Sequence, residues 1–142
     1  MKTIWTIDLN GMMKEICMQI ITLFFIFNAT MLLLHEIESS YEKEWEILGL
    51  PGRITGFLLL HIPIIILLFY GALEIEKRTQ VGLIIGIISG IGGIIPFLVH
   101  KIIVRHKDRF NLLISNVLIY ANIITGLVTA ALSIINICRQ DY

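Results

Sequence analysis

The sequence contains few charged residues. Only 15% of its 142 residues are Asp, Glu, Lys or Arg, and the formal net charge is zero, whereas soluble domains carry roughly 25% charged residues. No run of basic residues of the kind that binds phosphate backbones is present, which excludes nucleic acid as a partner. Cysteine is scarce as well: Cys17 and Cys138 have no CxxC or Cys/His zinc spacing around them, and both are expected to be small buried hydrophobic residues.

Familiar catalytic motifs are also missing. The patterns G-x-S-x-G, H-E-x-x-H and the P-loop do not occur, and each of these would have marked a nucleophile, a metalloprotease or a nucleotide site. The sequence therefore identifies no nucleophile, and any enzymatic activity has to be argued from individual polar side chains.

Long apolar runs dominate the chain. They account for a hydrophobic content of 56% and a mean hydropathy of +0.85, and a run of about 20 residues matches the ~30 Å hydrocarbon core of a bilayer. Four such runs occur, at residues 16–34, 54–73, 81–99 and 112–137. Because short connections join antiparallel neighbours, we predict an all-α, multi-pass membrane protein in which residues 1–142 form a single antiparallel four-helix transmembrane bundle. The first span is expected to be a retained signal anchor, since no small-x-small cleavage site follows it.

Polar residues gather at one end of the predicted bundle. His35 ends the first span and His100 ends the third, so both lie on the same side of the lipid bilayer. His61 enters the second span from that side and lies about 10 Å deep at 1.5 Å per residue. An ionisable group inside a span is a functional candidate by default, although a hydrogen bond to Asn116 or Tyr120 would also satisfy it. The opposite half of the bundle is expected to be almost purely aliphatic.

The segment HEIESSYEKEWEILGLPGR follows the first span. On a helix His35 and Glu38 are neighbours at i and i+3, a spacing found in metal sites of helix bundles. The same helical period places Glu42 and Glu46 on the His35 stripe, which predicts an interfacial helical extension after the first span. Tyr41 and Trp45 are expected to anchor this extension at the membrane surface.

Imidazole and carboxylate side chains are the ligands that zinc, iron or manganese prefer. The predicted ligands of a divalent metal are His35, Glu38, His61 and His100, and the predicted acid or base residues beside them are Glu36 and Glu38. The alternative is that the glutamates form a solvated surface and that the histidines are ordinary interfacial residues.

The third span carries small residues at regular steps. Gly82, Gly86 and Gly90 recur every four residues, and this small-xxx-small spacing lets two helix backbones approach closely in lipid. The stripe predicts close packing within the bundle, with a homo-oligomer through the same glycines as the alternative.

The stretch from residue 35 to residue 71 resembles an uncharacterised family of small four-span, mainly bacterial membrane proteins, domain of unknown function family 6713. Members carry a similar H-E-I-[DE]-x-x-Y-x-K-E-W-E-[LI]-x-x-L-P-G segment before an aliphatic helix. The resemblance implies a bacterial inner or plasma membrane location, and it adds Glu44 to the candidate catalytic residues. The matching positions are His35, Glu36, Glu38, Tyr41, Glu44, Trp45, Glu46, Pro51 and Gly52. The family implies no activity.

Two functions from different classes remain open on these observations. One is an interfacial His/Glu site that binds a divalent metal, or acts as acid and base, on a lipid-like substrate. The other is a non-enzymatic membrane subunit, oligomeric or partner-binding, whose acidic segment docks a basic partner.

Overall fold

The described part of the chain is helical. The computed structural model describes residues 9–103 and 112–140, and no strand occurs among them. In chain order the helices are α1 (Leu9–Tyr41), α2 (Glu44–Leu48), α3 (Arg53–Glu76), α4 (Gln80–Gly92), α5 (Ile95–Phe97), the π-helix η1 (Leu98–Ile103) and α6 (Leu113–Gln140).

Four stretches of the described chain are long and apolar enough to cross a membrane. They are Gly11–Tyr41, Arg53–Glu76, Gln80–Ile103 and Leu113–Cys138. Each overlaps one of the predicted runs, so the prediction of an all-α protein with four membrane-crossing helices is confirmed. Many large apolar side chains on these helices point outward, among them Leu59 and Phe69. An outward apolar surface of this kind matches a lipid environment.

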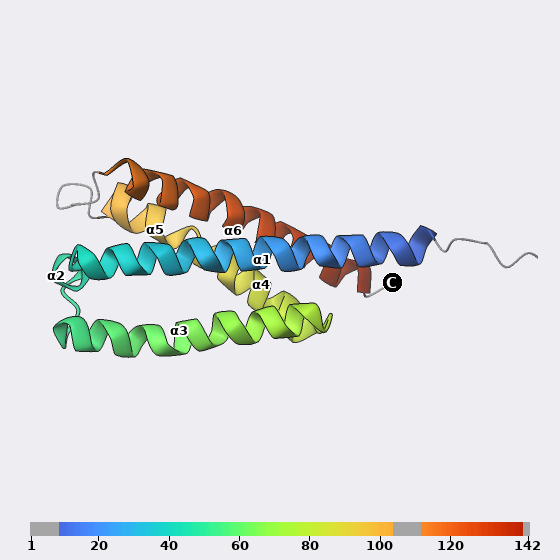
Figure 1. The fold of residues 1–142 in the computed structure, drawn as a ribbon, viewed down its shortest axis with the longest axis horizontal. Coiled ribbons are helices and arrows are strands. Elements are labelled where there is room, and N and C mark those ends of the chain that lie inside the picture. Colours follow the sequence, from blue (N-terminus) through green and yellow to red (C-terminus); the bar gives the residue numbers. More distant parts are fainter. Residues whose placement is uncertain (1–8, 104–111, 141–142) are drawn as a thin grey trace, which may run out of the picture.

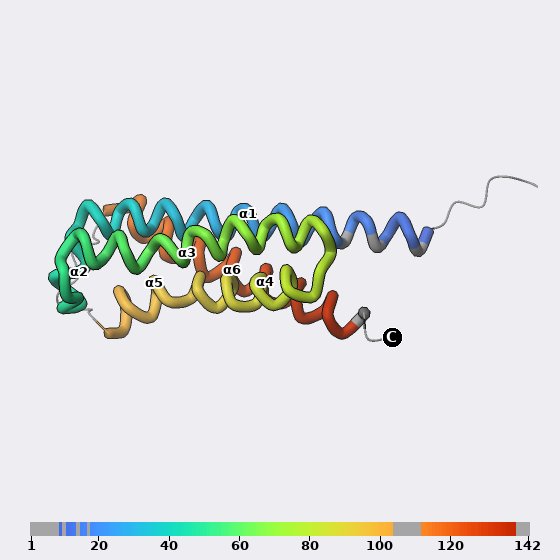
Figure 2. The backbone as a smooth tube through the Cα atoms, turned by 90° about the horizontal axis from the view of Figure 1, so that it is seen from below, coloured from blue at the N-terminus to red at the C-terminus, as the bar shows by residue number. Residues whose placement is uncertain are grey.

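The four long elements form a bundle in which each is flanked by two neighbours. α1 packs against α3 and α6, and α4 packs between α3 and α6 (Figure 1). The start of α1 and the end of α6 lie at one end of the bundle, and α2 lies at the other (Figure 2). From its start beside α3, α4 runs across the bundle toward α6, and α5 packs against α6. The two walls formed by α3 and by α4–α5 therefore diverge toward the α2 end.

The glycines of α4 provide close contacts within the chain. A Cβ atom on Gly82 would collide with the backbone of Glu74 and Ile75 in α3, and one on Gly86 would collide with Ser133 in α6. At Gly90 the nearest atom is the carbonyl oxygen of Gly126, 2.5 Å from an added Cβ. The predicted small-residue stripe thus faces two neighbouring helices of the same bundle.

Buried polar side chains run through the bundle as well as at its α2 end. The Nδ2 amide of Asn28 donates to the Oγ of Ser89 at 2.8 Å, and the hydroxyl of Thr125 donates to the Oδ1 of Asn28 at 3.1 Å. Further along α6, the buried hydroxyls of Thr129 and Ser133 donate to carbonyl groups one turn earlier. The expectation of an almost purely aliphatic opposite half is therefore wrong, because α6 carries a polar stripe that satisfies itself by back-bonding.

Two backbone breaks shape the α2 end. Lys43 adopts a left-handed conformation with φ 55° and ψ 49°, and it separates α1 from α2. α4 ends at Gly92, and Pro96, which has no amide hydrogen to bond back to the Gly92 carbonyl, lies in the first turn of the short helix α5 that leads into the π-helix η1. The first span therefore extends as helix to Tyr41, but α2 folds back instead of prolonging it.

This fold-back changes the surroundings of the expected interfacial anchors. Trp45 is buried and its ring lies 5.7 Å from the ring of Phe57 in α3, so it acts as a packing residue and not as a surface anchor. Tyr41 is largely exposed, as an anchor requires. Cys138 is exposed on α6, so the expectation that it is buried is wrong, and the side chain of Cys17 lies outside the described residues.

Candidate functional site

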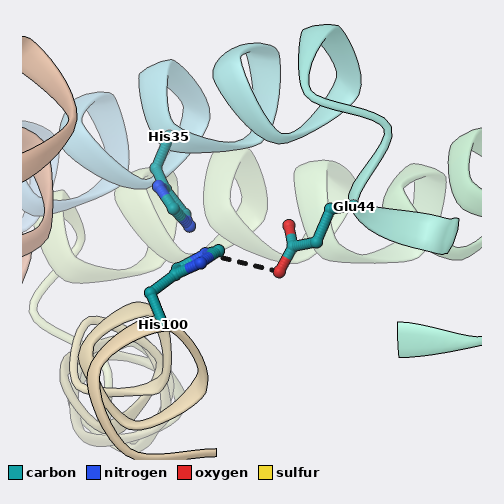
Figure 3. A group of neighbouring side chains, drawn as sticks. All are labelled: His35, Glu44 and His100. Atoms are coloured by element: carbon teal, nitrogen blue, oxygen red, sulfur yellow. Dashed lines mark ion pairs between the residues drawn. The ribbon is translucent and has the colours of Figure 1, made fainter. Parts of the chain in front are cut away.

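Three ionisable side chains from three different elements meet at the α2 end of the bundle. They are His35 of α1, Glu44 of α2 and His100 of η1, each of which offers a metal-ligand atom within 4.8 Å of the other two. In Figure 3 the His35 ring points toward the His100 ring, and the Glu44 carboxylate approaches from the side. The two imidazole centroids are 5.1 Å apart at an interplanar angle of 79°. The Nε2 of His100 lies 3.4 Å from the Oε1 of Glu44.

All three side chains of this cluster are buried. His100 is fully buried, His35 is 2% exposed and Glu44 is 7% exposed. Burying a carboxylate away from water is costly unless it is paired or binds a metal. Within the cluster the neighbours of Glu44 are two imidazole rings, which are neutral when they bind a metal, so a cation placed between the three side chains would offset this cost.

Glu38 borders the cluster and does not belong to it. One of its oxygens accepts a short hydrogen bond from the Oγ of Ser115, at the start of α6. The other oxygen, Oε2, lies 4.0 Å from the Nδ1 of His35. A carboxylate behind a metal-binding histidine fixes the orientation of the ring and raises its basicity. The structure thus places the predicted ligand Glu38 beside His35, at a distance longer than a hydrogen bond.

Glu36 and His61 form a separate pair. The Oε2 of Glu36 lies 2.6 Å from the Nε2 of His61, and the Nδ1 of His61 lies 2.6 Å from the carbonyl oxygen of Phe57. Because a carbonyl only accepts hydrogen bonds, Nδ1 must carry the hydrogen. The short contact between Nε2 and the carboxylate then contains a shared proton, which makes the pair suited to acid–base work.

The partners of His61 differ from those expected from the sequence. The two partners expected from the sequence have other contacts: the Asn116 amide donates to the carbonyl of Leu112, and the Tyr120 ring packs on Phe97. The pairing with Glu36 arises because α1 and α3 are neighbours whose ends are joined through α2. Thus His61, a predicted metal ligand, lies beside the cluster and against a predicted catalytic residue.

Glu44 is the cluster member that helical periodicity alone does not find. A continuous helix would have carried Glu42 and Glu46 on the His35 stripe, but the left-handed residue Lys43 ends that register. As a result Glu44 is buried, whereas Glu46 is exposed and Glu42 is intermediate. The signal that pointed to Glu44 was the sequence resemblance, and the left-handed conformation of Lys43 gives its physical reason.

A cavity of about 460 Å³ adjoins these polar groups. Glu44, His35, Glu36 and His61 line one end of it, and the remaining lining residues are almost all aliphatic side chains, which come mainly from α1, α3, α4 and α5. Two members of the cluster, His35 and Glu44, therefore face the same space as the Glu36–His61 pair.

The donor set matches what a catalytic metal site requires. Two atoms bound to one zinc ion at about 2.1 Å lie within about 4.2 Å of each other, so small side-chain movements would bring the three ligand atoms onto one ion. Three protein ligands, including combinations of two histidines and one glutamate, leave a fourth position for water or substrate in catalytic zinc sites. His35, Glu44 and His100 supply this combination.

Fold and site together define a multi-pass, all-helical membrane protein with a buried His/Glu cluster at one end of its bundle. The sequence profile of DUF6713, a family of unknown function, matches residues 21–136. The chain belongs to this family, in agreement with the resemblance seen in the segment after the first span. No curated protein and no solved structure matches the chain.

Proposed function

We propose that this protein is a metal-dependent membrane enzyme that acts on a lipid-like substrate. The observation that carries the proposal is the buried cluster of His35, Glu44 and His100, whose ligand atoms lie within 4.8 Å of one another. Zinc, iron or manganese fits this mixture of imidazole and carboxylate ligands. The proposed location is a bacterial plasma membrane, with residues 1–142 acting as one transmembrane domain.

The surrounding residues have distinct roles in this proposal. Glu38, held by Ser115, lies 4.0 Å from the Nδ1 of His35 and would orient the ring by closing to hydrogen-bond distance, as carboxylates do for metal-binding histidines. Glu36 and His61 share a proton in the same cavity and act as the acid–base pair. A bound divalent cation would lower the pKa of a coordinated water toward about 7 and make it a nucleophile. The Glu36–His61 pair, which holds one proton between Nε2 and the carboxylate, would exchange that proton with a group bound in the cavity.

The alternative of a non-enzymatic, oligomeric subunit has weaker support. Its main argument was the stripe of Gly82, Gly86 and Gly90, and these glycines pack against α3 and α6 of their own chain. The buried cluster would also be unexplained in a purely structural subunit.

The proposal is tested by metal analysis of the purified protein. Elemental analysis of detergent-purified wild-type protein should show close to one equivalent of zinc, iron or manganese. Glu44→Gln keeps the side-chain volume and removes the charged ligand, so this variant should lose most of the metal. Glu46→Gln is the matched control, because Glu46 is an exposed residue of the same helix α2 outside the cluster, and it should keep the metal.

Stability measurements give a second readout of the same site. A ligand present at 100 times its Kd stabilises a protein by about 2.7 kcal/mol, so added zinc should stabilise metal-stripped wild-type protein and the Glu46→Gln control. The Glu44→Gln variant should show little of this gain. The metal proposal would be refuted if the wild-type protein is metal-free as purified and no divalent cation stabilises it.

A further inference from the structure

The cavity beside the cluster is elongated along the helix axes. From Phe57 to Leu68 its α3 wall rises about 16 Å at 1.5 Å per residue, and its other wall runs from Ile88 in α4 to Val99 in η1. Half of the ~30 Å hydrocarbon core, or the depth of one leaflet, is about 15 Å. His61 is paired with Glu36, which lies just beyond the first predicted span, so the polar end of the cavity lies near the membrane surface and not at the depth of about 10 Å expected from the sequence. Leu68, seven residues further along α3, lies about 10 Å deeper, within the same leaflet.

The cavity opens sideways between α3 and α4–α5. Leu60 on α3 is 52% exposed, and Ile91 and Ile95 on the opposite wall are 56% and 53% exposed, although all three line the cavity. Residues that line a cavity and still face outward mark its rim. Since these helices span the membrane, the medium at this rim is lipid hydrocarbon, so the opening faces the acyl chains of one leaflet.

The two ends of the cavity differ in chemistry. Its deep end is lined by Leu67 and Leu68 with a single small polar group from Ser89, and its shallow end by His35, Glu36, Glu44 and His61. An acyl chain needs only aliphatic contact along its length, whereas the ester or headgroup at its end carries polar atoms. A lipid chain oriented like those of the surrounding leaflet would place that polar group beside the cluster.

We propose that the cavity binds one acyl chain of a membrane lipid, which enters sideways between α3 and α4–α5 and presents its ester or headgroup to the His/Glu cluster. This inference rests on the proposed function, because it names the substrate class of the same site. Leaflet depth, lateral opening and polarity gradient all select a single acyl chain over a water-soluble ligand.

The test uses a photoreactive lipid and a matched pair of substitutions. Protein is reconstituted in phosphatidylcholine vesicles that contain a phosphatidylcholine with a diazirine in one acyl chain, and cross-linked positions are mapped by mass spectrometry. Leu60→Trp places a bulky ring on the rim of the cavity. Leu59→Trp makes the same change on the neighbouring residue, which is 62% exposed and does not line the cavity.

A second blocking variant fills the cavity from the other wall. Gly92 lines the cavity, and an added Cβ would meet only the Cδ1 of Leu32, at 3.9 Å. Gly92→Phe should therefore be accommodated by projecting into the empty space. The metal content and the thermal unfolding of every variant are measured in parallel, which shows that a variant has folded.

The expected result is cross-linking at the deep, buried positions Leu68 and Ser89 in the wild type and in Leu59→Trp, with a several-fold loss in Leu60→Trp and Gly92→Phe. Lipid that merely surrounds the protein reaches exposed positions and not these two. Cross-linking confined to exposed positions, or equal in all four proteins, overturns the inference. A wild-type protein that contains no metal and that no divalent cation stabilises, but that still cross-links at Leu68 and Ser89, would refute the metal site alone, so the two proposals fail by different measurements.

Discussion

Substitution of two neighbouring glycines in α4 separates packing within the chain from packing between chains. An added Cβ at Gly90 would lie 2.5 Å from the carbonyl oxygen of Gly126 and 2.8 Å from the Cβ of Ala130. An added Cβ at Gly92 has only the Cδ1 of Leu32 nearby, at 3.9 Å. The same substitution to alanine is therefore made at one crowded and one open position of a single helix.

The magnitudes follow from two opposing effects. Replacing glycine by alanine inside a helix stabilises it by up to about 1 kcal/mol, whereas overpacking typically costs about 1–3 kcal/mol. Because the nearest atom to Gly90 is a backbone oxygen, which cannot rotate away, overpacking dominates there. Gly90→Ala should destabilise the protein by about 1–2 kcal/mol, and Gly92→Ala should leave it unchanged or slightly more stable.

The assay is reversible unfolding in mixed micelles, followed by circular dichroism, together with size-exclusion chromatography for the oligomeric state. Equal effects of the two substitutions on the free energy of unfolding would refute the packing argument. An unchanged free energy for Gly90→Ala, together with a shift to a smaller assembly, would show that the stripe joins separate chains.

Two further predictions concern the surroundings of the cluster. Ser115→Ala removes the hydroxyl that donates to Glu38, and it should destabilise the protein by about 1–3 kcal/mol. It should also weaken metal binding about 10- to 100-fold, because Glu38 would no longer orient His35. Unchanged affinity in a zinc titration would contradict the orienting role. Lys43→Gly relieves a left-handed conformation that costs a non-glycine residue roughly 1–2 kcal/mol. The variant should therefore have a higher free energy of unfolding and keep the metal. A destabilised variant would contradict this explanation of the break after α1.

The helices and their order were predictable because lipid imposes a strong constraint. A backbone inside hydrocarbon must satisfy its own hydrogen bonds, so long apolar runs become helices, and the short connections make them antiparallel. The same logic placed His35 and His100 at one end of the bundle, where the structure brings them together. The small-residue spacing of α4 likewise indicated close packing, which Gly82 and Gly86 show.

The identity of the third cluster member depended on a local break that periodicity does not reveal. The stripe of Glu42 and Glu46 assumes an uninterrupted helix, and one left-handed residue, Lys43, is enough to exchange them for Glu44. The Glu36–His61 pair was missed for a different reason. Which side chain of one helix meets which of the next depends on the rotation of each helix about its axis and on its shift along that axis, and the sequence of His61 and its neighbours gives neither.

The polar stripe of α6 carried a readable signal. Asn122, Thr125, Thr129, Ser133 and Asn136 follow the three- and four-residue steps of one helix face. Short hydroxyl side chains satisfy themselves on their own helix, so such a stripe is compatible with a buried position in a membrane. It then packs against the glycine face of α4, where small side chains on both sides allow a close approach.

The position of His100 in the cluster depends more on the number of residues in the segment that carries it, η1, than on which apolar residues these are. Ile102 and Ile103 are 60% and 70% exposed, so they can vary among apolar residues without moving the imidazole. Loss of a single residue between Pro96 and His100 would instead turn the ring well away from the cluster, since one residue covers about 100° around an α-helix and somewhat less around the wider turn of a π-helix. Insertions and deletions in this segment would be far more damaging than substitutions. A fixed number of residues between the proline and the histidine would therefore distinguish relatives that keep the site from other membrane proteins with similar helices.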